Sequence, residues 1–103
     1  MSSRFTRLTE ILATLDAPVL VSGDGPDAPE LRKAFPGRPT SPATVVETTG
    51  SAAGLAAALA LAADHGTVVL AGPAPSAAPT LDLYHDLHVR GLTVVGIAPE
   101  TNP

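Results

Sequence analysis

Four short runs of mainly apolar and β-branched residues constrain the fold of this chain more than any other feature. They cover residues 18–22, 43–49, 67–72 and 92–97. Their Val and Leu residues are consecutive and do not alternate with polar residues, which is typical of strands buried on both faces. Because segments of helical character separate the runs, the sequence predicts an α/β fold, with a four-stranded parallel sheet and helices on both faces.

The segments between the runs carry signals for the ends of helices. Residues 52–63 form a long Ala/Leu segment for which Ser51 is a suitable N-cap. Gly66 suits the left-handed position that follows a helix. Pro29 suits the first turn of a short helix that ends near Phe35, because a proline there loses no hydrogen bond. Two further helices are expected, at 4–15 from the spacing of apolar residues and at 81–90.

Length and composition indicate one small domain with a thin core. A chain of 103 residues is about one domain, and we expect a single unit over 1–103, with an N-terminal helix within 1–15 and a frayed tail at 99–103. The chain is 45% hydrophobic and 16% charged, as in folded rather than disordered proteins. Only 3% of the residues are aromatic, so each buried side chain covers little area. Association with a partner is a common way for such a domain to gain stability.

Charge and cysteine content exclude several classes of function. The net charge is −4 with six basic residues, too few to neutralise a phosphate backbone, so we expect no nucleic-acid partner. Glu10 and Asp16 interrupt the apolar N-terminal stretch, which is too short for a signal peptide or a membrane span. We therefore expect a cytoplasmic protein with no membrane partner. The chain has no cysteine, which excludes disulfides, thiolate catalysis and cysteine-ligated zinc.

Three motifs follow one another between residues 44 and 97: ETTGS at 47–51, GTVVLAG at 66–72 and DLYHDLHVRGLTVVG at 82–96. Together they resemble the last three strands of the cofactor-binding domain of the medium-chain dehydrogenase/reductase superfamily, which includes the zinc-type alcohol dehydrogenases. Upstream, VLVSGDGPDA at 19–28 is similar to that family's first strand and glycine-rich phosphate turn. The resemblance implies a truncated Rossmann-like sheet whose strands follow the family's spatial order 1-4-5-6, because the second and third strands are omitted.

The resemblance also implies a candidate cofactor site. Gly23, Gly25 and Pro26 fall at the positions of the family's phosphate turn, where backbone amides approach a pyrophosphate. The loops that follow Thr49 and Gly72 would face the nicotinamide in the family's arrangement. These five residues are therefore the candidate cofactor-binding set.

Departures from the family's pattern oppose NAD(P) binding, and we expect no cofactor. Asp24 and Asp27 place negative charge where a pyrophosphate would lie. The omitted second strand is followed in the family by the acidic residue that holds the adenosine ribose. The family's zinc ligands and catalytic domain have no counterpart, so we expect no metal site and no stand-alone zinc-dependent dehydrogenase activity. The glycines then serve turn geometry alone.

Glu47, Tyr84, His85 and His88 are the candidate acid–base residues. Glu47 is the one carboxylate within a predicted strand, while His85 and His88 are three residues apart, as for neighbours on one helix face. Histidine is suited to proton transfer near neutral pH. The alternative interpretation is a solvated or interface helix with no catalytic role, and a strand-end residue at Glu47.

The last run, Leu92–Ile97, is expected to be an apolar edge strand. It contains no charged residue, and such an edge is prone to associate. In the resemblance this edge joins two subunits, so we predict a homodimer in which the run pairs antiparallel with its own copy. Three functions remain open. They are an accessory module that binds a small ligand or a partner protein, a repurposed small enzyme of bacterial metabolism, and an NAD(P)-binding oxidoreductase component.

Overall fold

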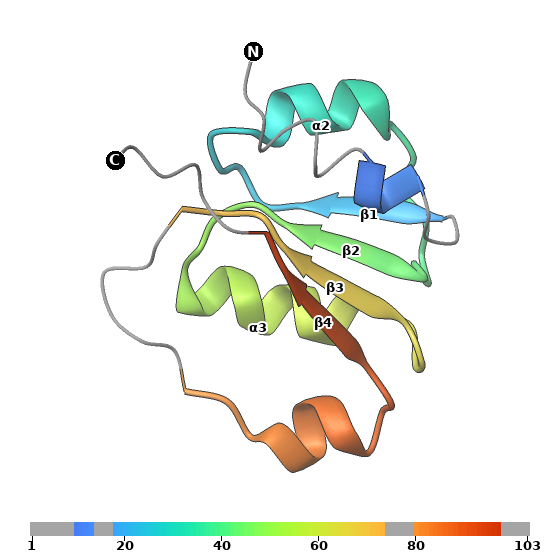
Figure 1. Cartoon of the computed structure of the whole chain (residues 1–103), viewed down its shortest axis with the longest axis vertical. Helices are drawn as coiled ribbons and strands as arrows, with labels where there is room; N and C mark the ends of the chain where they lie inside the picture. The colour runs from blue at the N-terminus through green and yellow to red at the C-terminus, as the bar shows by residue number, and fades with distance from the viewer. Residues whose placement is uncertain (1–9, 14–17, 74–79, 98–103) are drawn as a thin grey trace.

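A four-stranded sheet forms the centre of the described part of the protein (Figure 1). The computed structural model describes residues 10–13, 18–73 and 80–97. Within them the strand order is β1-β2-β3-β4, and every neighbouring pair is parallel. This is the α/β, Rossmann-like arrangement that the sequence predicts. The strands are β1 (Val19–Ser22), β2 (Thr44–Glu47), β3 (Thr67–Leu70) and β4 (Thr93–Gly96).

Three helical elements with assigned bounds connect the strands. They are α2 (Ala28–Ala34), α3 (Ala52–Leu61) and the π-helix η1 (Tyr84–His88). The helix expected at 52–63 ends earlier because the backbone of Ala62 is extended. The one expected at 81–90 contracts to the five residues of η1. Of the helix expected at 4–15, residues 10–13 are helical, while its other residues and the tail at 99–103 lie outside the described residues.

The two faces of the sheet bury separate sets of side chains. Alternate residues of a strand point to opposite faces, so the register places Val21, Val46 and Val69 in one row. That row belongs to the core that includes Leu31 of α2 and Leu12. On the other face Val45 and Val68 pack against α3, in a core formed also by Leu55, Ala58, Leu59 and Ala62.

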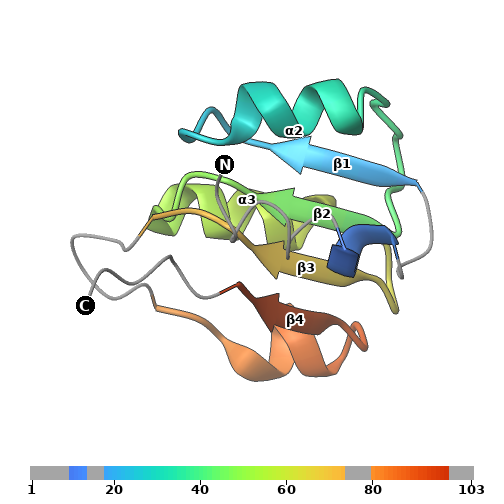
Figure 2. The same cartoon turned by 45° about the horizontal axis from the view of Figure 1, so that its top comes forward.

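The two edge strands of the sheet, β1 and β4, differ in how they are covered. Figure 2 shows α2 above β1 and η1 below β4, with β2 and β3 between them. All four residues of β2 are buried, β3 is buried at its two central residues and half-buried at its ends, and three of the four residues of β4 are exposed. β4 is therefore the least covered strand of the sheet.

α3 begins where the sequence predicts. The Ser51 hydroxyl accepts a hydrogen bond from the Gly54 amide at 2.9 Å, which satisfies one of the unpaired donors of the first turn.

No helix in the described part of the chain is long and apolar enough to span a membrane.

Candidate functional site

The glycine-rich turn after β1 packs on the end of β2. The buried hydroxyl of Thr48 accepts a hydrogen bond from the Gly25 amide at 3.1 Å and donates one to the Ser22 carbonyl at 2.7 Å. A Cβ atom at Gly25 would overlap the Thr48 carbonyl. Gly23 has a φ of +84°, which favours glycine, and a Cβ there would overlap the Thr49 methyl group. These glycines are thus required by the close contact between two loops.

Several amides that a phosphate turn would present are already used or missing. The Gly25 amide is bonded to Thr48, and the Ala28 amide donates to the Gly25 carbonyl at 3.0 Å. Pro26 and Pro29 have no amide hydrogen. Because pyrophosphate binding depends on amides that point at the ligand, this turn is poorly equipped for it.

The loops after β2 and β3 are in direct contact at the carboxyl edge of the sheet. Gly50 has a φ of +70°, and a Cβ there would overlap the carbonyl of Pro73. A Cβ at Gly72 would overlap the Gly50 amide. Gly23 packs on Thr49 in the same region. The structure therefore brings Gly23, Gly25, Thr49 and Gly72 together at the carboxyl ends of the strands, and Pro26 lies exposed in the turn beside them.

The carboxylate of Glu47 is buried at the carboxyl end of β2, and the loop that follows β2 holds it. Its Oε1 accepts hydrogen bonds from the amide of Thr49 at 2.7 Å and from the hydroxyl of Thr49 at 2.5 Å. Its Oε2 accepts one from the amide of Gly50 at 3.0 Å. The residue is 2% exposed, so this carboxylate fixes the loop between β2 and α3.

The polar residues of η1 form a separate, exposed group. The Tyr84 ring lies 5.2 Å from the rings of both His85 and His88. The His85 Nδ1 lies 2.8 Å from an oxygen of Asp82, and the His85 amide donates to the other oxygen at 3.1 Å. The hydrogen bond from the His85 side chain, followed by the one from its amide, lowers the pKa of the Asp82 carboxyl.

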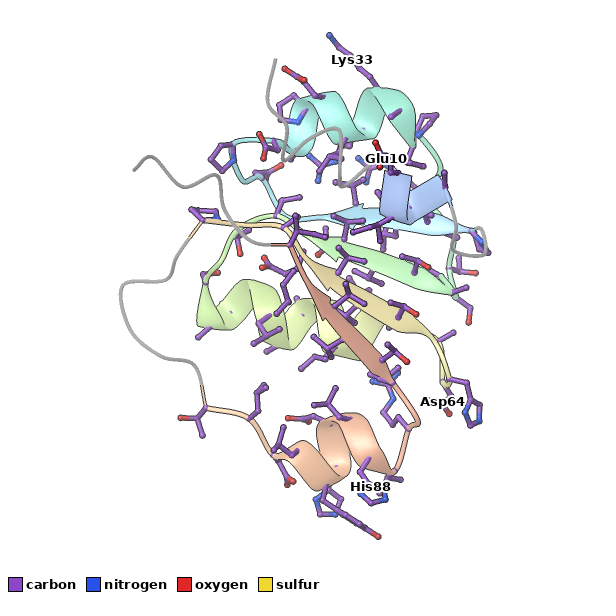
Figure 3. All side chains as sticks on the ribbon, viewed as in Figure 1. Glu10, Lys33, Asp64 and His88 are labelled. Carbon is purple, nitrogen blue, oxygen red and sulfur yellow. The ribbon has the colours of Figure 1, made fainter. Side chains whose placement is uncertain are left out.

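The acid–base candidates divide into two groups rather than one pocket. Glu47 is at the carboxyl end of β2, whereas η1 leads into the amino end of β4. Figure 3 shows His88 on η1, at the opposite side of the molecule from Lys33 of α2. Among the residues that the structure describes, no group of three His, Cys, Asp or Glu side chains is arranged to hold a metal ion.

An open groove lies beside the start of β4. It has a volume of about 580 Å³ and is lined by Leu83, Tyr84, Leu87, His88, Gly91 and Leu92. Five large hydrophobic residues are exposed in the described part of the chain, and four of them occur between residues 83 and 94. We call these four the β4 patch: Leu83, Tyr84, Val89 and Val94.

Two arginines with clear structural roles were missed by the sequence analysis. Arg32 reaches from α2 to the carbonyl groups of β1 and the turn after it. Arg90 donates hydrogen bonds to the carbonyls of Leu59 and Ala62 at the end of α3, and its Nε lies 3.0 Å from Asp64. Arg90 lies about 30 positions from the carbonyls it binds, so no local pattern could have identified its role. The side chain of Thr48, within the ETTGS motif, holds the glycine turn, and the sequence did not predict this role.

Neither the protein-family models nor the curated proteins contain a match to this chain.

Proposed function

We propose that this chain is an accessory module without hydride-transfer activity, derived from a dehydrogenase cofactor domain, that forms a homodimer through β4 and binds a small ligand or a partner protein. The observation that carries the proposal is that the outer side of β4 is unpaired. No strand among the described residues pairs with its outer side, and it carries no charge. Such an edge is a template for pairing with another chain.

The hydrogen-bonding groups of this edge are available in alternation. The amides of Thr93 and Ile97 donate inward, to the carbonyls of Gly66 and Leu70 on the β3 side. Because successive residues of a strand direct their amide and carbonyl groups to opposite sides, Val94 and Gly96 direct theirs outward. An antiparallel second copy of β4 can receive these bonds in an isologous, two-fold contact.

The β4 patch supplies the area that strand pairing alone lacks. Stable protein interfaces bury about 1,200–2,000 Å² in total, which a strand of four residues cannot provide. Leu83, Tyr84 and Val89 are 58–64% exposed and lie on the segment that leads into β4. A buried aromatic residue is a common anchor of an interface, which favours Tyr84 for that role.

Other features favour a ligand that is not a dinucleotide. The amides of Gly25 and Ala28 are already hydrogen-bonded, and Glu47 is occupied by its own loop. The open groove has a volume of about 580 Å³, within the range of small-molecule sites, and both apolar side chains and the polar groups of Tyr84 and His88 line it. Because Leu83 and Tyr84 line this groove and also belong to the β4 patch, we assign the ligand site of the module to the seam of the dimer.

A charge within β4 tests the dimer. We expect Val94→Lys to convert the dimer into a monomer in sedimentation velocity runs at tens of micromolar protein, because a paired edge would bury the ammonium group. Leu61→Lys is the matched control, since Leu61 is 45% exposed on α3 and lies outside the β4 patch. The control should remain dimeric. Equal sedimentation of both variants and the wild type would contradict the proposed interface.

A thermal-shift screen tests the absence of cofactor binding. With NAD, NADP, AMP and ADP at millimolar concentration, we expect the melting temperature to change by less than about 1 °C. A ligand present at 100 times its Kd adds about 2.7 kcal/mol of stability, which raises the melting temperature of a domain of this size by roughly 10 °C or more. A shift of several degrees with a dinucleotide alone would support the oxidoreductase alternative instead.

A further inference from the structure

The sheet has a second edge, formed by β1, and the side chain of Arg32 contacts two carbonyls on its outer side. The carbonyls of Pro18 and Ser22 accept hydrogen bonds from Thr44 and Thr48, so they face β2. By the alternation along a strand, the carbonyls of Val21 and Gly23 face away from β2, toward the outer side of β1. These are two of the backbone groups with which an added strand would pair.

The side chain of Arg32 holds both of these carbonyls. Its Nη2 lies 2.5 Å from the Gly23 carbonyl oxygen and 3.5 Å from that of Val21. Its Nη1 forms an ion pair with Asp24 at 3.0 Å, which fixes the guanidinium across the edge. The helix α2 that carries Arg32 lies along β1 in both views of the fold (Figures 1 and 2).

The two edges of the sheet also differ in charge. Three of the six basic residues of the chain, Arg32, Lys33 and Arg38, lie on or just after α2, and Arg32 and Arg38 line a hollow of about 160 Å³ beside Leu20 of β1. Charged side chains at a sheet edge, and a helix that covers the edge, are known protections against strand addition. β4 has no comparable residue.

We infer that Arg32 closes the β1 edge and thereby limits assembly of this protein to the β4 edge. Were both edges open, β1 of one copy would pair with β4 of the next, and because this contact is heterologous the sheets would extend without closing. With β1 closed, only the isologous β4 contact remains. The limit of two copies rests on the dimer proposed above, whereas the closure of β1 by Arg32 does not.

The experiment compares two substitutions at neighbouring positions of α2. Arg32→Met keeps a long unbranched side chain with good helix propensity but removes every donor. Lys33→Met removes the same charge from a side chain that points away from the sheet (Figure 3). Mean mass is measured by light scattering between 10 and 200 μM, chosen as roughly the range in which weak interfaces assemble. Circular dichroism establishes that each variant is folded, and Arg32→Ala provides a second test of the same position.

We expect the mean mass of the Arg32 variants to rise with concentration to more than about twice that of the wild type, while the Lys33 variant matches the wild type. Adding Val94→Lys to Arg32→Met should end this growth, because the chain-extending contact needs both edges. Folded Arg32 variants with the wild-type mass at every concentration would overturn the inference. A monomeric wild type would instead refute the β4 dimer, and the contrast between the Arg32 and Lys33 variants would still test the closure of β1.

Discussion

At the scale of single residues, Thr48 connects two loops that are far apart in the sequence. Its hydroxyl is the acceptor for Gly25 and the donor to Ser22, and the side chain is buried. The hydroxyl therefore satisfies two backbone groups of the glycine turn at once. This contact explains Gly25, and the packing of Gly23 on the Thr49 methyl group explains Gly23, without a bound phosphate.

Removal of this hydroxyl should be costly. Thr48→Val keeps the shape of the side chain but removes the acceptor of the Gly25 amide, while the Ser22 carbonyl keeps its hydrogen bond from the Thr48 amide, so we expect a loss of about 1–3 kcal/mol in the free energy of unfolding. Urea denaturation measures the loss. Thr80→Val, at an exposed position, should change the same quantity by less than about 0.5 kcal/mol. If both variants unfold at the same urea concentration, the connecting role of Thr48 is wrong.

The sequence predicts some of these residue-level features and misses others for a physical reason. Ser51 is the N-cap of α3 as expected, because capping is decided within a few residues. The left-handed position after α3 is taken by His65, with a φ of +65°, and not by Gly66. Gly66 is required because a Cβ there would press on the carbonyls of Ala43 and Ala63. Ala43 belongs to another loop, and its proximity cannot be read from local sequence.

At the scale of elements, the end of α3 is held by a residue from the segment before β4. The Arg90 guanidinium caps the carbonyls of Leu59 and Ala62, and the His65 amide donates to the Arg90 carbonyl at 2.8 Å. α3 has no basic residue in its last turn, so this cap comes from outside the helix. Arg90 thereby fixes the segment that contains η1 to α3.

Arg90→Lys should reveal this link. A lysine ammonium cannot reproduce the planar fork that reaches two carbonyls and Asp64, so we expect the free energy of unfolding to fall by about 1–3 kcal/mol. Asp64→Asn removes only the exposed ion pair and should cost less than about 1 kcal/mol. Both values come from urea denaturation. A loss in Asp64→Asn as large as that in Arg90→Lys would show that the ion pair, and not the cap, is responsible.

The strands were predicted more accurately than the helices. All four strands lie within the apolar runs, because consecutive buried Val and Leu residues are a strong local signal. The π-helical form of η1 was not predicted, since its five residues carry no periodic pattern that separates it from an α-helix. The sequence predicted the candidate site residues from their residue types. Their division into two groups depends on the end of the sheet at which each residue lies, which residue type does not reveal.

At the scale of the whole molecule, the parallel order of the sheet follows from the alternation of strands and helices. What the sequence could not supply is the difference between the two edges of this sheet. The apolar composition of β4 was visible, whereas the occupation of β1 by Arg32 required the fold. In the proposed assembly, β4 is therefore the interface and β1 is the protected edge.

Amide hydrogen exchange at β4 tests this account most directly. The outward amides of Val94 and Gly96 are open to solvent in a single copy and hydrogen-bonded in a β4 dimer, whereas the amide of Ile97 is bonded to Leu70 in either state. We predict that Val94 and Gly96 exchange slowly at high protein concentration and at least about tenfold faster on dilution below the dissociation constant of the dimer, with Ile97 less affected. Fast exchange at Val94 and Gly96 at every concentration would contradict the account.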